Sequence, residues 1–241
     1  MRILAIETTG PICSVALLNE ENRITELRGR ERMNHLRSLT PMIDQLLQAE
    51  NMAPEDLDQI AVSVGPGSFT GIRIGVSTAR AMAQMTGVRL TAVPTLYAFG
   101  CGVCPEEDPA LVVCPMLDAR RQQVYAGAYR DGEEIVAGKP YPLDVFLDHL
   151  TDMKRIRFMG DGIARYGESV QEWARIHGVE AALDEETQSA GYVAELARDM
   201  MDAPDFADMI NLDYNQLQPN YMRKAEAQRR LEEKQKQGQR R

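Results

Sequence analysis

Apolar and polar positions along the first hundred residues predict a continuous run of strands and helices. Short apolar runs bounded by turn residues indicate strands, whereas apolar residues that recur every three or four positions indicate helices. These patterns predict strands at residues 2–7, 12–18, 24–28, 60–64 and 90–93 and helices at residues 35–49 and 69–86. Because three strands precede the first helix, the order excludes a plain alternation of strand and helix.

A second and shorter set of elements begins near residue 110. Its patterns predict strands at residues 111–117, 123–129 and 156–159 and helices at residues 143–150, 169–177 and 191–201. The element order of the first half resembles that of the actin-like and sugar-kinase ATPases (the ASKHA, ribonuclease H-like class), in which two such halves enclose a nucleotide. We therefore expect an α/β, actin-like, two-lobed fold with a truncated second lobe. The expected parts are an N-terminal lobe at residues 1–105, a C-terminal lobe at residues 106–222 and a tail at residues 223–241.

The predicted helix at residues 69–86 has one face that carries almost no side chains. Residues four apart share a helix face. The small residues that this spacing aligns, here called the small-residue face, are Gly71, Gly75, Ala79 and Ala83, with Thr78 beside them. Each interior glycine costs about 1 kcal/mol relative to alanine, so the close approach of another element must offset that cost. The spacing leaves two alternatives open: this face packs against the protein's own sheet or helix, or it receives a helix of a partner.

The glycine-rich segment at residues 65–71 precedes this helix and invites comparison with nucleotide-binding loops. A Walker loop requires Lys followed by Ser or Thr after its last glycine, whereas Gly71 is followed by Ile72 and Arg73. A dinucleotide loop requires G-x-G-x-x-G after the first strand and an acidic residue about twenty positions later, and neither condition is met. The specific phosphate-binding motifs are therefore excluded, although backbone N–H groups at a helix start can hold an anion.

Composition is that of a globular protein with a sizeable core. The 241 residues are 44% hydrophobic and 26% charged. No apolar run approaches the roughly 20 residues of a membrane-spanning helix, and the N-terminus lacks a signal-peptide pattern, so we expect a cytoplasmic protein. Cys13 and Cys114 lie in apolar runs and are expected to be buried thiols. Cys101 and Cys104 form a C-x-x-C after a predicted helix end, where the helix dipole does not favour a redox pair.

The net charge of −9 conceals an asymmetry between the tail and the rest of the chain. Residues 223–241 contain eight basic and three acidic residues, so they carry +5, whereas the remaining 19 basic and 33 acidic residues carry −14. The acidic body is not suited to broad nucleic-acid binding. The tail is able to contact phosphate or an acidic partner, and its plainer interpretation is a solvated helix.

Candidate catalytic chemistry is sparse in this sequence. The three histidines, His35, His149 and His177, are far apart and show no metal-binding spacing. No nucleophile and base, and no carboxylate pair, are singled out by spacing. Glu7 follows the first strand, where actin-like ATPases keep an acidic residue for the phosphate–magnesium site, and with Thr8 and Thr9 it forms a weak remnant of that site. The simpler interpretation of Glu7 is a turn residue. We therefore predict no catalytic residue, cofactor or metal ion.

Several segments in the expected order resemble the TsaB (YeaZ) family, bacterial proteins of tRNA threonylcarbamoyladenosine synthesis. The matching segments are residues 3–9 (ILAIETT), Asn34 and His35 with the helix at 39–44, residues 65–73 (GPGSFTGIR), 116–120 (MLDAR) with Val124 and Tyr125, 160–162 (GDG) and 219–223 (PNYMR). The GPGSFTGIR segment is specific, whereas the others are informative only together. The resemblance implies a two-lobed fold, a cytoplasmic location and a subunit without chemistry of its own.

The resemblance also implies the partners. TsaB-like proteins pair with the paralogous transferase TsaD through two N-lobe helices, and alone they form homodimers through the same surface. A TsaE-like ATPase joins the larger complex, and tRNA is contacted only indirectly or through the basic tail. TsaD enzymes carry a His-x-x-x-His metal motif after the strand corresponding to residues 90–93, whereas residues 94–99 here contain no ligand.

Two hypotheses of different classes follow. In the first, the chain is a non-catalytic subunit that docks and activates TsaD. The interface residues predicted for it are Leu36, Leu39, Ile43, Gly71, Gly75, Thr78, Ala79 and Ala83. On this hypothesis Gly75→Leu or Ala79→Arg abolishes the complex and leaves the fold intact. In the second, the chain is a small actin-like ATPase or a glycoprotease-like metallopeptidase that acts alone, which requires tight ATP or metal binding by the isolated chain.

Overall fold

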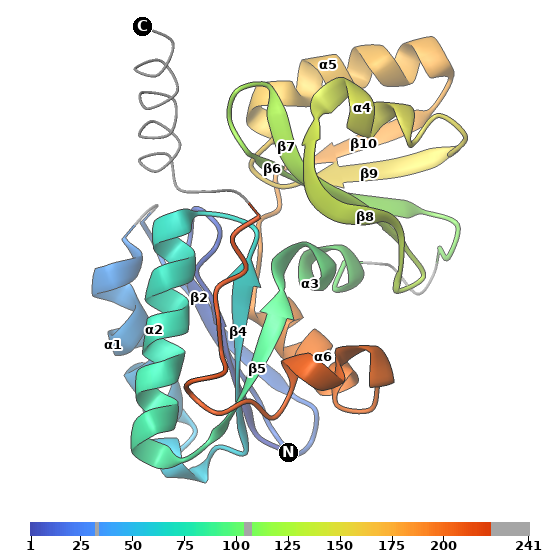
Figure 1. The fold of residues 1–241 in the computed structure, drawn as a ribbon. Coiled ribbons are helices and arrows are strands. Elements are labelled where there is room, and N and C mark those ends of the chain that lie inside the picture. The colour runs from blue at the N-terminus through green and yellow to red at the C-terminus, as the bar shows by residue number, and fades with distance from the viewer. Residues whose placement is uncertain (32–33, 104–107, 223–241) are drawn as a thin grey trace, which may run out of the picture.

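A computed structural model describes residues 1–31, 34–103 and 108–222 of the chain (Figure 1). The predictions for Cys104 and for the basic tail at residues 223–241 fall outside this part. Cys13 and Cys114 are buried thiols, as expected. A helix both long enough and apolar enough to cross a membrane does not occur among the described residues.

The first sheet contains the five strands predicted in the first half of the chain. Its strands are β1 (Ile3–Glu7), β2 (Ser14–Leu18), β3 (Ile24–Arg28), β4 (Gln59–Gly65) and β5 (Arg89–Pro94). They lie in the order β3-β2-β1-β4-β5. β1, β2 and β3 form an antiparallel meander, while β4 and β5 run parallel to β1. The carboxyl ends of β1 and β4 therefore meet at one edge of the sheet, where Glu7 and the glycine-rich segment lie.

Helices cover both faces of this sheet (Figure 1). They are α1 (His35–Ala49) and α2 (Phe69–Thr86) on one face and α3 (Thr95–Cys101) and α6 (Ala190–Met200) on the other. Side chains alternate along a strand. In β1, Leu4 and Ile6 accordingly pack beneath α1 and α2, whereas Ile3 and Ala5 pack beneath α6. Both faces of β1 are thus buried, which explains its apolar sequence from Ile3 to Ile6.

The second sheet repeats the strand directions of the first. Its strands are β6 (Val112–Asp118), β7 (Gln123–Arg130), β8 (Glu133–Pro142), β9 (Arg155–Met159) and β10 (Glu180–Asp184). They lie in the order β10-β9-β6-β7-β8; β6, β7 and β8 form an antiparallel meander, and β9 and β10 run parallel to β6. Its helices are α4 (Leu143–Asp148) and α5 (Ile163–His177). α5 begins six residues before the predicted helix at 169–177, and the strands β8 and β10 were not predicted.

The chain returns to the first sheet after β10. α6 packs on β1 and β2, and the segment that follows includes the short 3-10 helix η2 (Pro204–Met209). Leu212 exchanges two backbone hydrogen bonds with Leu90 of β5, and the Asn220 N–H donates to the Val64 carbonyl at 2.8 Å. Residues from 190 onward therefore pack with the first lobe, so the expected extent of the second lobe, residues 106–222, is wrong at its C-terminal end.

The small-residue face of α2 points into the first lobe. A Cβ atom added at Gly71 would lie 1.9 Å from the Thr8 carbonyl oxygen, and one at Gly75 would lie 2.3 Å from the Thr8 hydroxyl oxygen. Ala79 and Ala83 are buried in the same hydrophobic core. The prediction that this face receives a partner helix is wrong, and the alternative that it packs against the protein's own sheet is confirmed.

Of the other predicted interface residues, some are buried in the core and some are accessible at the surface. On α1, Leu39 and Ile43 are buried in the core, whereas Leu36 is 79% exposed. Thr78 of α2 is half-buried. Helical spacing identified the faces correctly, but only Leu36 and Thr78 remain accessible to a partner. The substitutions Gly75→Leu and Ala79→Arg would therefore disrupt the core rather than leave the fold intact.

Substitution of Gly71 by Ala tests this close contact. We expect Gly71→Ala to lower the free energy of unfolding by about 1–3 kcal/mol, because the added methyl group overpacks the contact with Thr8. This loss should outweigh the gain of up to about 1 kcal/mol in helix propensity. Urea denaturation measures the change. Ser77→Ala, on the exposed side of the same helix, is the control and should change stability by less than about 0.5 kcal/mol. Wild-type stability of Gly71→Ala would show that α2 does not pack this closely.

Candidate functional site

The carboxylate of Glu7 is buried at the end of β1. Glu7 is only 1% exposed. Oε1 accepts hydrogen bonds from the Thr9 N–H at 2.5 Å, the Thr9 hydroxyl at 2.7 Å and the Gly10 N–H at 3.3 Å. Oε2 accepts a hydrogen bond from the Ser63 hydroxyl of β4. Both oxygens are thus used by the protein's own donors, and the carboxylate fixes the turn that follows β1.

That turn is also joined to the glycine-rich segment before α2. The Thr8 hydroxyl donates to the Gly71 carbonyl at 2.9 Å, and the Ser68 N–H donates to the Thr9 carbonyl at 2.8 Å. Gly67 has φ 154°, and a Cβ there would lie 2.6 Å from the Thr9 carbonyl oxygen. Only glycine suits this position, because it combines positive φ with close backbone contact. The predicted remnant at Glu7, Thr8 and Thr9 is therefore brought together as a structural junction between β1 and α2.

Burial raises the pKa of the Glu7 carboxyl above its ordinary value of 4.5, while its hydrogen bonds with Ser63, Thr9 and Gly10 oppose the rise. Desolvation disfavours the charged form, and donors directed at the oxygens favour it. Desolvation is the larger effect here. The carboxyl therefore retains its proton in the folded state at pH values where an unfolded chain has lost it.

The outer surface of α1 and α2 carries exposed apolar side chains. The two helices lie side by side on the first sheet (Figure 1). Leu36 is 79% exposed and Met85 is 86% exposed. We call eight accessible, uncharged residues of these helices the outer helical face: Leu36, Thr40, Pro41, Ser77, Thr78, Ala81, Met82 and Met85. The charged residues Arg37, Asp44, Arg73 and Arg80 of the same helices are accessible as well. α2 contains no acidic residue, although the chain before residue 223 carries −14.

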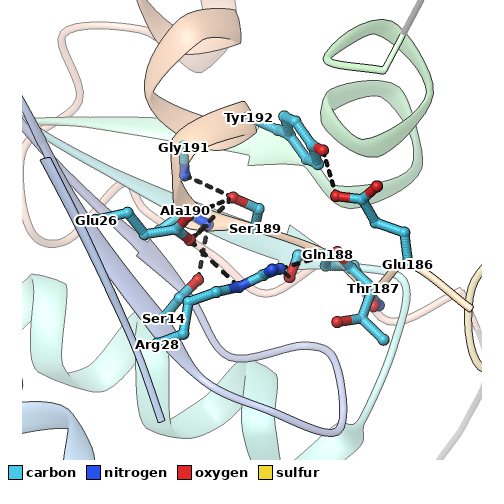
Figure 2. A network of polar contacts seen from close by, with 10 residues as sticks. All are labelled: Ser14, Glu26, Arg28, Glu186, Thr187, Gln188, Ser189, Ala190, Gly191 and Tyr192. Carbon is cyan, nitrogen blue, oxygen red and sulfur yellow. Dashed lines mark hydrogen bonds and ion pairs between the residues drawn. The ribbon is translucent and has the colours of Figure 1, made fainter. Parts of the chain in front are cut away.

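A polar network fixes the start of α6 against the edge of the first sheet, as Figure 2 shows. The Glu26 carboxylate of β3 accepts hydrogen bonds from the Ser189 hydroxyl at 2.9 Å and from the Ala190 N–H at 3.0 Å. The Ser14 hydroxyl of β2 also accepts from the Ala190 N–H, at 2.7 Å. An acidic side chain at a helix N-terminus is favourable because the free N–H groups there carry partial positive charge.

The linker that precedes α6 is held by the same network. The Arg28 guanidinium donates to the carbonyls of Thr187 at 3.2 Å and Gln188 at 3.1 Å, and the Tyr192 hydroxyl donates to Glu186 at 2.6 Å (Figure 2). The connection from β10 to α6 is thus tied to β3. The sequence analysis missed this network. Its one local signal was Ser189, two residues before the helix predicted at residues 191–201, since serine is a preferred N-cap.

The raised pKa of Glu7 predicts a specific pH dependence of stability. As pH rises from about 4.5 towards the raised pKa of the folded state, the unfolded chain loses the proton first, so stability falls. Glu7→Gln cannot ionise, so the Tm of this variant should rise relative to the wild type across that window. Each kcal/mol of difference should appear as about 2–4 °C.

Thermal unfolding between pH 4.5 and pH 8 measures this difference. Glu21→Gln, which makes the same change at an exposed turn position, is the control. A pH-independent offset for Glu7→Gln would contradict the role assigned to burial.

Comparison with known proteins identifies the relatives of this chain. A family model described as "TsaD: tRNA N6-adenosine threonylcarbamoyltransferase" matches residues 31–150. The tRNA threonylcarbamoyladenosine biosynthesis protein TsaB of Bacillus subtilis (strain 168) is 30% identical, over 98% of this chain and 100% of the relative. The protein of the same name from Haemophilus influenzae is 28% identical, over 82% of this chain and 85% of the relative.

Solved structures that resemble this chain point to the same family and to the same fold. The structure described as YeaZ from Pseudomonas aeruginosa matches with a TM-score of 0.70 at 28% identity, over 91% of this chain and 99% of its own. The ethanolamine utilization protein EutJ of Carboxydothermus hydrogenoformans matches with a TM-score of 0.50 at 10% identity, over 80% of this chain and 89% of its own, which shows the fold alone. The predicted actin-like α/β fold is confirmed. The full-length similarity to the Bacillus protein shows that this chain belongs to the TsaB (YeaZ) family of tRNA threonylcarbamoyladenosine biosynthesis proteins.

Proposed function

We propose that this chain is a non-catalytic subunit that binds and activates a TsaD-like threonylcarbamoyltransferase. The observation that carries the proposal is the state of Glu7. In an actin-like ATPase the acidic residue at this position serves the phosphate–magnesium site. Here its two oxygens accept four hydrogen bonds from Thr9, Gly10 and Ser63, and the residue is 1% exposed. A carboxylate used in this way supports the fold rather than a metal ion.

The outer helical face is the surface that we assign to the partner. Interface centres are enriched in methionine and depleted of charged residues relative to the rest of a protein surface. Met82, Met85 and Leu36 supply the apolar part, and α2 contributes no acidic residue. A specific interface buries about 800 Å² on each partner, which is an area that two adjacent helices can supply. The same face would join two copies when the chain is alone.

The rest of the assembly is part of the proposal and is based on the family resemblance. The coarse role, participation in tRNA threonylcarbamoyladenosine biosynthesis, matches the names of the relatives. On this proposal the TsaD-like enzyme transfers the threonylcarbamoyl group to adenosine, a TsaE-like ATPase completes the larger complex, and all act in the cytoplasm on tRNA. This chain positions the enzyme through α1 and α2.

Charge substitutions on the outer helical face test the docking proposal. We expect Leu36→Asp combined with Met85→Asp to weaken binding to the TsaD homologue from the same cell at least tenfold, because the variant buries two carboxylates in an apolar interface. Affinity is measured by calorimetry, and size-exclusion chromatography should show loss of self-association. Both residues are exposed, so Tm should change little.

A matched substitution on the second lobe provides the control. Ile176 of α5 is 63% exposed, and Ile176→Asp should leave partner affinity unchanged. Wild-type affinity of the double variant, or an equal loss in the control, would refute docking through this face.

Activity measurements separate the two classes of function. We expect the chain to accelerate transfer of the threonylcarbamoyl group to tRNA by the TsaD homologue. We also expect the isolated chain to show no heat of binding with Mg-ATP or Zn²⁺ by calorimetry. Tight nucleotide or metal binding by the isolated chain, without acceleration of the enzyme, would instead favour the actin-like ATPase or metallopeptidase.

A further inference from the structure

The two helices that carry the outer helical face form a positive region on an otherwise acidic body (Figure 1). α1 and α2 together contain three arginines and one acidic residue, Asp44, so they carry +2. The remaining 16 basic and 32 acidic residues before residue 223 carry −16. We call Arg37, Arg73 and Arg80 the helical arginines. The two helices therefore differ from the rest of the body in the sign of their charge as well as in their exposed apolar side chains.

The helical arginines border the outer helical face. Residues three or four apart are neighbours on a helix surface. Arg37 precedes Thr40 of that face by three residues. Ser77, another member of the face, lies four residues after Arg73 and three before Arg80. Arg37 and Arg73 are exposed and Arg80 is half-buried, so a protein that covers the outer helical face comes within reach of all three charges.

The positive charge of the helical arginines is not compensated within the part of the chain that the structure describes. No carboxylate of that part lies within 4.0 Å of their guanidinium nitrogens. Arg23, by contrast, pairs with Glu50 at the end of α1 at 3.2 Å. Asp44 accepts a hydrogen bond from the Gln48 side chain at 2.9 Å. The charge of the helical arginines is therefore available to a docking protein.

Arg73 is held in position by aromatic side chains. Its guanidinium lies 5.6 Å from the centroid of the Phe69 ring, within the range of a cation–π contact. The Phe69 ring stacks in turn on the Tyr221 ring, with centroids 4.7 Å apart. The neighbouring Asn220 N–H donates to the Val64 carbonyl at 2.8 Å, which ties this segment to the end of β4. A charge that is already positioned loses less conformational entropy when a partner pairs with it.

These charges act in opposite directions on the two complexes proposed for the outer helical face. In a two-fold symmetric pair the same surface of each copy meets itself, so the helical arginines of both copies enter one interface. Like charges brought together across an interface are unfavourable. A different protein can instead present carboxylates to them. Apolar residues such as Met85 stabilise either complex and do not distinguish between them.

We propose that the helical arginines select the partner of the outer helical face: they favour a protein with an acidic contacting surface and oppose the pairing of two copies of this chain. This inference rests on the proposed function, and it adds the feature that distinguishes the complex with the TsaD-like enzyme from the homodimer. The acidic surface belongs to the TsaD-like enzyme on this proposal. Electrostatic attraction of this kind acts mainly on the rate of association.

Three variants of the full-length chain test the proposal. The first replaces all three helical arginines by Gln, and the second replaces them by Lys, which retains the charge. The third removes three positive charges from exposed positions of the second lobe by combining Arg130→Gln, Lys154→Gln and Arg175→Gln. Sedimentation equilibrium measures self-association, and surface plasmon resonance measures the rates of binding to the TsaD homologue. Both are performed at about 50 and about 300 mM salt, since salt screens exposed charges.

The expected results have opposite signs for the two complexes. At low salt the glutamine variant should self-associate about tenfold more tightly than the wild type and bind the TsaD homologue about tenfold more weakly, because exposed charge pairs contribute a factor of about 1.4–5 each. The weaker binding should appear mainly in the association rate. Both differences should narrow at high salt. The lysine variant and the second-lobe variant should stay within about twofold of the wild type in both measurements.

Several results would overturn the proposal. Self-association of the glutamine variant that is no tighter than that of the wild type would do so, and so would an unchanged affinity for the TsaD homologue. Equal effects in the second-lobe variant would assign them to net charge, and equal effects in the lysine variant would assign them to side-chain shape. If the wild-type chain does not bind the homologue, the proposed function fails. Tighter self-association of the glutamine variant would then still show that the helical arginines oppose the homodimer.

Discussion

The close contact between α2 and the turn after β1 is the constraint on which the first lobe depends. Gly71 and Gly75 allow the helix backbone to approach Thr8 so closely that a Cβ atom at either position would overlap it. The same turn is fixed from within by the Glu7 carboxylate, which links it to Ser63 on β4. The hydroxyl and backbone groups of this turn bond to α2 and to the glycine-rich segment, so the turn is part of the core.

This constraint also determines what α2 presents to the outside. Because the small residues face inward, the opposite side of the helix carries the accessible ones, from Arg73 near its start to Met85 near its end. The C-terminal segment reaches the start of the same helix, where Tyr221 contacts Phe69. One helix thus connects the buried junction, the outer helical face and the point from which the basic tail begins. In this account the surface proposed to bind the partner protein lies along an element that the glycines hold in place.

The sequence predicted local features well and long-range ones poorly. The strands of the first sheet and the extent of α2 were predicted correctly, because apolar runs and helical spacing are local signals. Helical spacing also located the small-residue face, but spacing does not say which element covers a face, and the partner interpretation was wrong. The strands β8 and β10 were missed, since β8 contains Gly138 and Pro140 and β10 is a half-exposed edge strand. The return of residues 190–222 to the first lobe, and the Ser63 bond to Glu7, join segments too far apart in the chain to leave a local pattern.

Hydrogen exchange tests most directly the claim that the junction is structural while the outer helices bind the partner. Exchange of the amides at residues 7–10 and 65–71, and of those in α1 and α2, would be compared for the chain alone, with Mg-ATP and with the TsaD homologue. The account predicts that Mg-ATP changes none of these rates and that the homologue slows exchange in α1 and α2. Slower exchange at residues 7–10 and 65–71 with Mg-ATP alone, and no change in α1 and α2 with the homologue, would contradict it.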